Sequence, residues 1–221
     1  MKGDVKLANV AKFSLKEIGH VCAHFERTVK PGHYSNLDID SSKTIHNENL
    51  APHRPEGQVK YVKKMLDNIS HAKRKDLVCL CSIVVNVPKD LPAQMHEKFF
   101  RETYKFLCER YGTISGFKNK EDIVVSCYRH CDETTDHIHF AFTPIKIDQN
   151  GKQRFIAKEV ICREDLKTLH SDLEKYLSEH GCRCQILNGN TQKDEFGKAL
   201  SVRALKRRDA HKIERQIERR F

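Results

Sequence analysis

Long apolar segments are absent from this sequence of 221 residues. No run approaches the roughly 20 apolar residues that a membrane-spanning helix needs. The N-terminal residues Met1 to Asp4 do not lead into the apolar segment of a secretory signal. We therefore expect a cytoplasmic protein that neither crosses a membrane nor is exported.

Paired cysteine motifs are also missing. The nine cysteines occur as Cys79-x-Cys81, Cys182-x-Cys184 and single residues, without a Cys-x-x-Cys pair. An odd number of thiols in a cytoplasmic protein fits neither a disulfide framework nor a zinc ribbon. We expect these thiols to be reduced.

The composition is that of a globular, basic protein. Hydrophobic residues make up 38% and charged residues 32%, which is enough to bury one core. The net charge of +10 and a pI near 9.1 favour a polyanionic partner, with nucleic acid first. Many basic proteins bind nothing acidic, so the charge alone does not identify a partner and the sequence motifs are needed.

Three histidines stand at the two ends of a predicted β-hairpin. His130, His137 and His139 lie between strand-like apolar runs at 123–128 and 140–145. Alternate side chains of a strand share a face, so His137 and His139 point the same way. An antiparallel reversal between the two runs returns His130 to the side of His137.

Three neutral imidazoles with open coordination positions are typical of a catalytic divalent-metal site. A lone histidine is more often a hydrogen-bonded core or surface residue, but this spacing, with Glu133 three residues after His130, favours metal ligation. We expect Glu133 to accept the free ring N–H of a ligand histidine, with direct ligation as the alternative.

A second candidate pair lies on the first predicted helix. The capping box from Ser14 to Glu17 predicts that this helix begins there. Its apolar residues, which include Phe25, fall on one face, and His24 and Arg27 lie side by side on the opposite, exposed face. Such a face is usually only solvated, so the pair gains interest if it meets the histidine cluster.

Residues 31–55 are polar and rich in turn-forming residues. Asn, Asp and Ser at this density hydrogen-bond their own backbone and form ordered loops. With Tyr34, Lys43, His46 and Arg54, this segment is suited to holding a phosphodiester strand. A plain connecting loop explains the composition equally well.

The remaining pattern predicts an α+β fold, in which a central antiparallel β-sheet has helices packed mainly on one face. The run at 77–87 is too apolar for an edge strand, so we place it in the middle of the sheet. The expected elements are a first strand at 5–13, helices from Ser14 and at 58–75, 93–111 (closed by Gly112) and 164–181, strands at 77–87, 123–128 and 140–145, a turn at 148–151 and a short strand at 154–161.

The C-terminal segment 201–221 differs from the rest. It holds eight basic residues against three acidic ones, and an apolar stripe. We predict a basic C-terminal helix whose charged face is free for phosphates, although a solvated terminal helix fits as well. We take 1–200 as the main domain. We take 201–221 as the first part of a further region, the rest of which is absent from this chain.

Three sequence motifs occur in the order found in one known family. They are Ala-His-Phe-Glu-Arg at 23–27, the Asn- and Asp-rich segment 34–47, and His130-x-Asp-Glu with His137-x-His139. The sequence therefore resembles the Mob/Pre plasmid mobilisation and recombination proteins. These are the MobV-type relaxases of the superfamily named for its His-hydrophobic-His (HUH) metal motif.

The resemblance covers nearly the whole chain, because 187–191 and 201–206 also resemble the end of that domain. Two positions depart from the family pattern. Phe25 stands where Asn is common, and Asp136 stands where Pro is common. The helix pattern places Phe25 on the buried face, whereas Asp136 is expected to loosen the hairpin turn or to add charge near the metal.

The resemblance implies a relaxase, a strand-specific endonuclease that nicks DNA at the transfer origin of a plasmid or mobile element and later rejoins it. It implies a Mn²⁺ or Mg²⁺ cofactor and a covalent 5′-phosphoryl intermediate. The implied partners are single-stranded or hairpin origin DNA, a type IV coupling protein, and a second copy bound through a region beyond residue 221.

The same resemblance assigns roles to individual residues. In the MobV-type branch the histidine of the first motif is thought to be the nucleophile, which is His24 here, with Tyr34 as the rival because tyrosine is usual in the superfamily. The implied roles are catalytic for His24, Arg27 and Glu133, metal-binding for His130, His137 and His139, and DNA-binding for Arg27, Tyr34, Asn36, Lys43 and Asn47.

Two other functions fit the same sequence. A rolling-circle replication initiator of the superfamily would share the metal and the nicking, and would differ in the origin that it cuts. A non-catalytic DNA-binding or autoregulatory module would need only the basic surfaces, and metal-independent binding without nicking would favour it.

Overall fold

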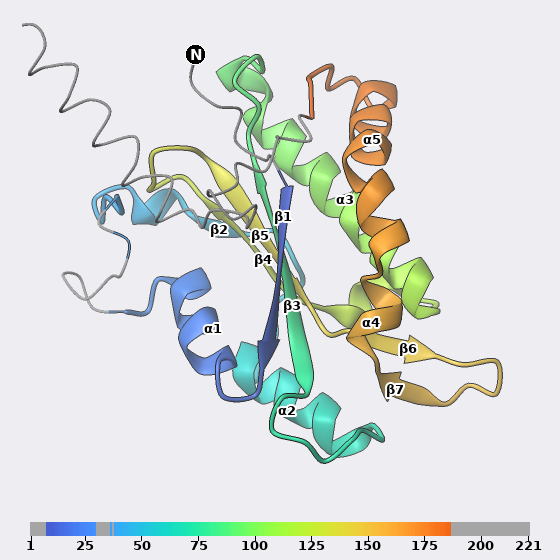
Figure 1. Cartoon of the computed structure of the whole chain (residues 1–221). Coiled ribbons are helices and arrows are strands. Elements are labelled where there is room, and N and C mark those ends of the chain that lie inside the picture. The colour runs from blue at the N-terminus through green and yellow to red at the C-terminus, as the bar shows by residue number, and fades with distance from the viewer. Residues whose placement is uncertain (1–7, 30–35, 37, 187–221) are drawn as a thin grey trace, which may run out of the picture. The chain divides into compact units, whose positions relative to one another are not determined.

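A computed structural model describes residues 8–29, 36 and 38–186 of the chain (Figure 1). These residues belong to one compact unit, 7–187. The rival nucleophile Tyr34 and the basic helix predicted at 201–221 lie outside the described residues.

The centre of the unit is a five-stranded antiparallel sheet with the strand order β1-β3-β5-β4-β2. All six residues of β5 are buried, because β5 is the middle strand and is covered on both faces. The run predicted as the middle strand became β3, which is interior but one place from the centre. The strands are β1 (Ala8–Ser14), β2 (Glu48–Asn49), β3 (Val78–Asn86), β4 (Val124–His130) and β5 (His137–Phe142).

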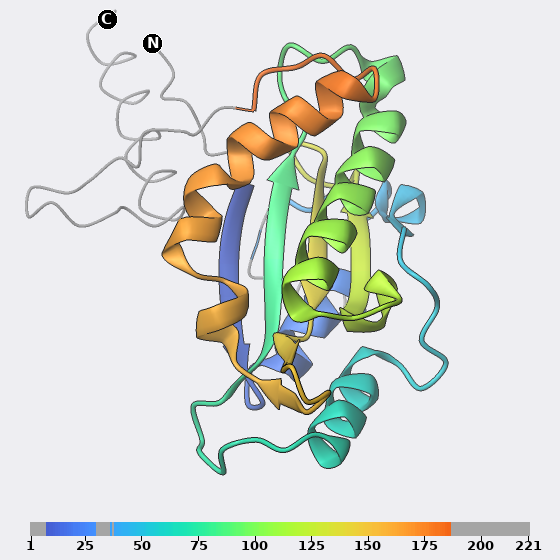
Figure 2. The same ribbon diagram turned by 90° about the vertical axis from the view of Figure 1, so that its right-hand side faces the viewer.

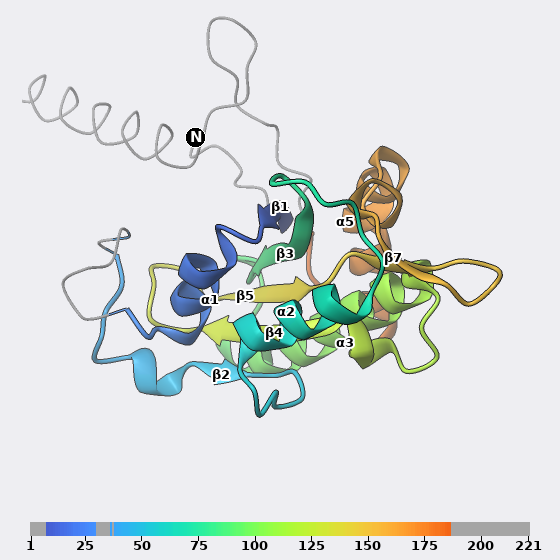
Figure 3. The same ribbon diagram turned by 90° about the horizontal axis from the view of Figure 1, so that it is seen from below.

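Helices lie on both faces of this sheet, with the two longest on one face (Figures 2 and 3). On that face the ring of Tyr111 from α3 stacks on Phe142 at 4.7 Å. On the other face His24 of α1 meets His139, at 5.2 Å between ring centroids. The α+β prediction is confirmed. The helices are α1 (Ile18–Glu26), α2 (Gln58–Asn68), α3 (His96–Ser115), α4 (Ala157–Val160) and α5 (Arg163–Glu179).

A small second sheet follows the main one. Strands β6 (Ile145–Ile147) and β7 (Gln153–Phe155) pair around the predicted turn, where Gly151 takes a φ of 76°. The segment predicted as a strand up to residue 161 is strand only at 153–155 and continues into α4. The short 3-10 helices are η1 (Thr44–His46), η2 (Ala93–Met95) and η3 (Lys120–Ile123).

Two helix ends differ from their predictions. The third helix continues past Gly112 to Gly116, which takes the left-handed φ of 81° of a C-cap. Gly112 instead allows close packing, because a Cβ there would lie 2.6 Å from that of Lys120. Helix α2 ends at Asn68 rather than at Lys75.

The helices of the described ranges include no segment that is both long enough and apolar enough to span a membrane.

Candidate active site

The predicted hairpin is present and brings its three histidines together. His130 lies directly opposite His137 where β4 and β5 pair. The ring centroids are 5.2 Å apart for His130 and His137, 4.8 Å for His130 and His139, and 4.9 Å for His137 and His139. All three residues are buried. The rings therefore converge on one point, as the spacing predicted.

The hydrogen bonds of these rings leave nitrogen lone pairs free at that point. His130 donates Nε2–H to the carbonyl of Phe25 at 2.9 Å, and His137 donates Nδ1–H to that of Thr135 at 2.8 Å. Within the described part of the chain, Nδ1 of His130 is buried without a hydrogen-bond partner. A buried, unpartnered nitrogen whose ring is oriented by a backbone carbonyl fits a metal ligand.

The spacing of the other two ring nitrogens also fits a cation. Nε2 of His137 and Nε2 of His139 are 3.1 Å apart. Two ligand atoms bound at about 2.1 Å to one ion lie about 3.0 to 3.4 Å from each other. Two sets of potential ligand atoms, each within 4.8 Å, contain His130: one with His24 and His139, the other with Glu133 and His137.

The first helix places His24 over this cluster. Its N-terminus carries the predicted capping box, since the Glu17 carboxylate accepts hydrogen bonds from both N–H and Oγ of Ser14. Ile18, Cys22 and Phe25 are buried, and the face that carries His24 meets the hairpin rather than solvent. The His24 ring lies 5.7 Å from that of His130.

Burial, followed by the charge of Arg27, lowers the pKa of His24 to about 4. Burial and the charge of Arg27 likewise lower the pKa of His130 to about 3, and burial holds the pKa of His139 well below its usual value. The rings are therefore neutral at neutral pH, which is the form that binds metals.

Arg27 ends α1 and joins it to the hairpin. Its backbone takes the left-handed conformation, with a φ of 54°, which is unusual for a residue with a side chain. Nε and Nη2 donate to the two carboxylate oxygens of Asp132 at 2.9 and 2.8 Å, and Nη2 also donates to Glu133 at 2.7 Å. Nη1 donates to the carbonyl of His24 at 3.1 Å and faces the His24 ring at 3.2 Å.

These contacts engage all three nitrogens of the guanidinium, whose side chain is only 2% exposed. The sequence placed Arg27 on an exposed helix face. The structure instead shows a buried Arg27 that holds the hairpin turn against α1.

The polar segment at 36–47 contacts the same turn, and we call these contacts the turn clamp. Thr44 Oγ1 and Asn47 Nδ2 donate to Asp132 at 2.9 and 2.8 Å, and Asn36 Nδ2 donates to Glu133 at 2.7 Å. Asn47 Oδ1 also accepts the N–H of Cys131 at 2.7 Å. Asn36 and Asn47, which the resemblance assigned to DNA, thus make their described contacts with the hairpin.

The turn clamp and Arg27 keep the Asp132 carboxylate ionised next to the histidines. Burial alone would raise the pKa of Asp132, but the hydrogen bonds from Arg27, Asn47 and Thr44 outweigh it and hold the pKa well below its usual value. Burial alone would lower the pKa of Arg27. The hydrogen bonds to Asp132 and Glu133 outweigh burial, so the pKa of Arg27 is raised. Two carboxylates against one guanidinium leave negative charge beside neutral imidazoles, which favours a divalent cation.

Glu133 has a different environment from the one expected. It does not accept a ring N–H from His130 or His137, because backbone carbonyls accept those protons. Its carboxylate is held by Arg27 and Asn36, and Oε1 lies 3.9 Å from Nε2 of His137. Glu133 is therefore within reach of the ligand set.

Asp136 and Lys43, two further residues named in the sequence analysis, make contacts outside the histidine cluster. Asp136 faces His96 at 3.5 Å and Arg129 at 3.9 Å, and its carbonyl accepts the N–H of Val87, so it anchors the turn rather than loosening it. Lys43 is exposed and pairs with Asp40. Sequence analysis missed Thr44 and the buried role of Asp132. The dense Asn, Asp, Ser and Thr pattern was the signal available.

Solved structures of relaxases share this fold. The relaxase domain of MobM, in a Mn-bound crystal structure with plasmid pMV158 oriT DNA, superposes with a TM-score of 0.70 and 26% identity, and covers 90% of this chain and 96% of that one. The conjugative relaxase TrwC in complex with oriT DNA superposes with a TM-score of 0.51 at 10% identity, over 86% of this chain and 74% of that one, which shows the fold alone.

The chain belongs to the Mob_Pre family of plasmid recombination enzymes, whose family model matches residues 2–201. A plasmid recombination enzyme of Streptococcus agalactiae is 27% identical over 215 residues, which are 90% of this chain and 40% of the relative. A type 1 plasmid recombination enzyme of Staphylococcus aureus is 29% identical over 159 residues, which are 67% of this chain and 36% of the relative. The chain thus spans about two fifths of the length of these curated relatives.

Proposed function

We propose that this chain is a relaxase domain that nicks one strand of DNA at the transfer origin of a plasmid or mobile element, and later rejoins it. The observation that carries the proposal is the position of His24, whose ring lies 5.2 Å from that of His139 and 5.7 Å from that of His130. A nucleophile beside a cluster able to bind a cation is what phosphoryl transfer requires.

In the proposed reaction a ring nitrogen of His24 attacks the scissile phosphorus. A nitrogen–phosphorus bond forms, and the bond from phosphorus to the 3′ oxygen breaks. The 3′ oxygen leaves with the electron pair and becomes a hydroxyl, as the proton on the other ring nitrogen of His24 is released. Attack by a 3′-hydroxyl reverses these changes and rejoins the strand, because no water has been consumed.

We propose that His130, His137 and His139 hold Mn²⁺ or Mg²⁺, with Glu133 close enough to join them. The two histidine Nε2 atoms 3.1 Å apart and the unpartnered Nδ1 support this ligand set. The bound cation would polarise the scissile phosphate and neutralise the charge that develops on it.

The other residues of the site have positioning roles in this proposal. Arg27 holds the His24 end of α1 against Asp132 and Glu133, so that the nucleophile and the hairpin keep one geometry. Its N–H groups are already used, so we assign transition-state charge to the cation rather than to Arg27.

Lys43 is exposed, and we propose that it contacts the DNA backbone. The substrate would be single-stranded or hairpin origin DNA. We extend two further proposals to the whole protein, namely docking to a type IV coupling protein and homodimer formation.

Nicking of a supercoiled plasmid that carries the cognate origin tests the proposal. We expect relaxation with Mn²⁺ or Mg²⁺ and none in EDTA, with the protein attached to the 5′ end. Full nicking by His24→Ala would refute the assigned nucleophile. Mass spectrometry of the adduct with a single-stranded origin oligonucleotide identifies the attached residue, and an adduct on Tyr34 would favour the rival.

A further inference from the structure

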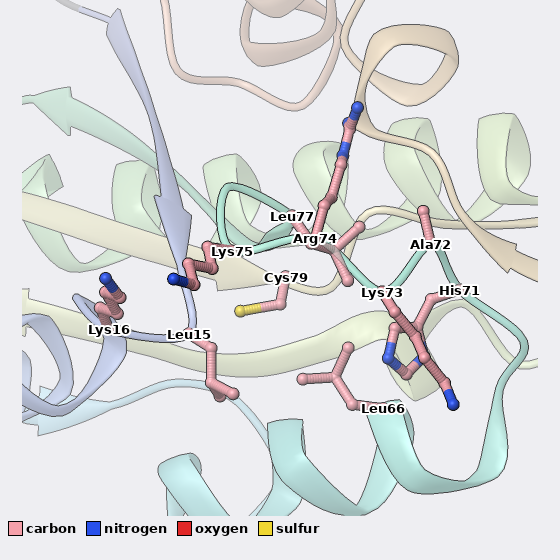
Figure 4. A pocket seen from close by; sticks show the side chains of 10 residues that line it. All are labelled: Leu15, Lys16, Leu66, His71, Ala72, Lys73, Arg74, Lys75, Leu77 and Cys79. Carbon is pink, nitrogen blue, oxygen red and sulfur yellow. The ribbon is translucent and has the colours of Figure 1, made fainter.

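A separate cavity lies at the other end of α1 from His24, and we call it the basic pocket (Figure 4). Its volume is about 400 Å³. Leu15, Leu66 and Leu77 provide an apolar floor, and Lys16, Lys73 and Lys75 are the basic residues of its rim. In Figure 4, Leu15 and Leu66 stand on either side of the sulfur of Cys79.

The position of the basic pocket follows from the chain. The first rim residue, Lys16, comes from the connection between β1 and α1, and the other two come from the connection between α2 and β3. Helices α1 and α2 contact each other on the sheet face that also carries the histidine cluster. The pocket and the candidate active site therefore share one face of the sheet.

The rim is rich in basic side chains. Lys16, Lys73 and Lys75 are exposed, and no carboxylate of the described ranges forms an ion pair with any of them. Arg74, between the last two, does pair with Asp76, at 3.4 Å. Three uncompensated ammonium groups raise the local concentration of anions.

The floor has the opposite character. Leu15 is 48% exposed, so its side chain is accessible to a ligand. An apolar floor within a cationic rim suits a ligand with a flat, weakly polar body and adjoining negative groups. A nucleotide within a DNA strand has this chemistry, and the cavity volume is in the range of about 300 to 1,000 Å³ of small-molecule sites.

The distance to His24 suits a continuous strand. Helix α1 has nine residues, which span about 13 Å at 1.5 Å each. This length corresponds to about four nucleotides at the 3.4 Å rise of stacked DNA, and to fewer in a more extended single strand. A strand whose phosphate lies at His24 therefore reaches the basic pocket a few nucleotides away.

We propose that the basic pocket holds one unpaired nucleotide of the DNA strand that is cleaved at His24, with its base on the apolar floor and the neighbouring phosphates on the rim lysines. The identity of the strand rests on the proposed function, whereas the binding of single-stranded DNA does not. The basic pocket would thus contact the DNA away from the reacting phosphate, and this contact needs no metal.

Equilibrium binding in EDTA tests the inference on the full chain. The probe is a fluorescein-labelled oligothymidylate of 25 nucleotides, followed by anisotropy over a range of salt concentrations. The test variant is Lys16→Ala Lys73→Ala Lys75→Ala. The matched control removes three exposed lysines from the α3 and α5 side of the unit: Lys118→Ala Lys167→Ala Lys175→Ala.

Losing three phosphate contacts to a single strand should make the slope of log affinity against log salt shallower by about 2. The test variant should therefore bind ten- to a hundredfold more weakly at 0.1 M salt, and the control variant should bind like the wild type. Equal losses in the two variants would overturn the proposal.

A second comparison tests the place of the base. Leu15→Ser should weaken binding of the oligothymidylate severalfold and leave binding of an abasic strand of the same length unchanged. An unchanged affinity for both strands would overturn base binding on the floor. Because EDTA prevents metal-dependent nicking, a wild type that binds as expected but never nicks origin DNA would refute the proposed function and leave this inference standing.

Discussion

Replacing Asp132 by Asn should uncouple the hairpin from α1 at a large cost in stability. The carboxylate is fully buried and accepts four hydrogen bonds, two from Arg27 and one each from Thr44 and Asn47. Asn keeps the shape of the side chain but removes its charge. Its NH2 group takes the place of one carboxylate oxygen, and there a donor would face the donors of Arg27, Thr44 or Asn47.

The size of the effect follows from those contacts. Removing one partner of a buried ion pair costs about 3 to 5 kcal/mol. Glu133 still contacts Arg27 after the change, so we expect a loss of about 3 to 4 kcal/mol. For a unit of this size, that lowers Tm by about 6 to 16 °C.

Urea denaturation of the chain, followed by circular dichroism, measures this loss. The control is Asp40→Asn, because the Asp40 carboxylate is exposed and should change stability by less than about 0.5 kcal/mol. A double-mutant cycle with Arg27→Gln should show that the two losses are not additive. A loss below about 1 kcal/mol for Asp132→Asn would refute the view that this ion pair joins the helix to the hairpin.

The remaining predictions concern the metal, two glycines and the thiols. His137→Ala should abolish the Mn²⁺ binding isotherm in titration calorimetry, and an unchanged isotherm would make the cluster structural. Gly116→Ala should destabilise the chain by about 1 kcal/mol in urea denaturation, since its φ is 81°, whereas Gly19→Ala inside α1 meets no atom within 4 Å and should stabilise it by about 0.5 to 1 kcal/mol. Burial raises the pKa of the Cys22 thiol to about 12, and it also raises that of Cys131, which is partly exposed. At pH 8 a disulfide reagent should therefore label Cys131 faster than Cys22, which should react only after unfolding; fast labelling of native Cys22 would contradict its burial.

Local patterns were enough to predict the hairpin and the convergence of its three histidines. The alternation of side chains in a strand put His137 and His139 on one face, and a short reversal was sufficient to return His130 to them. These relations involve residues close together in the chain, so they need no knowledge of the tertiary fold.

Long-range contacts could not be predicted in the same way. Helical periodicity showed that His24 and Arg27 share a face, but not that this face meets residues more than 100 positions away. The same limit explains Asn36 and Asn47, whose hydrogen-bond partners lie 84 to 97 positions further on. From the sequence alone, polar residues in a loop are equally consistent with contacting DNA and with supporting a turn of the protein.

The turn clamp has a consequence for genetics. Substitutions at Asn36, Thr44 or Asn47 would remove hydrogen bonds to the carboxylates beside the histidines, whether or not these side chains also contact DNA. A mutational screen scored by plasmid transfer would therefore mark these positions as though they recognised the origin. Loss of transfer there would not distinguish a disturbed histidine cluster from lost DNA contact until binding has been measured separately.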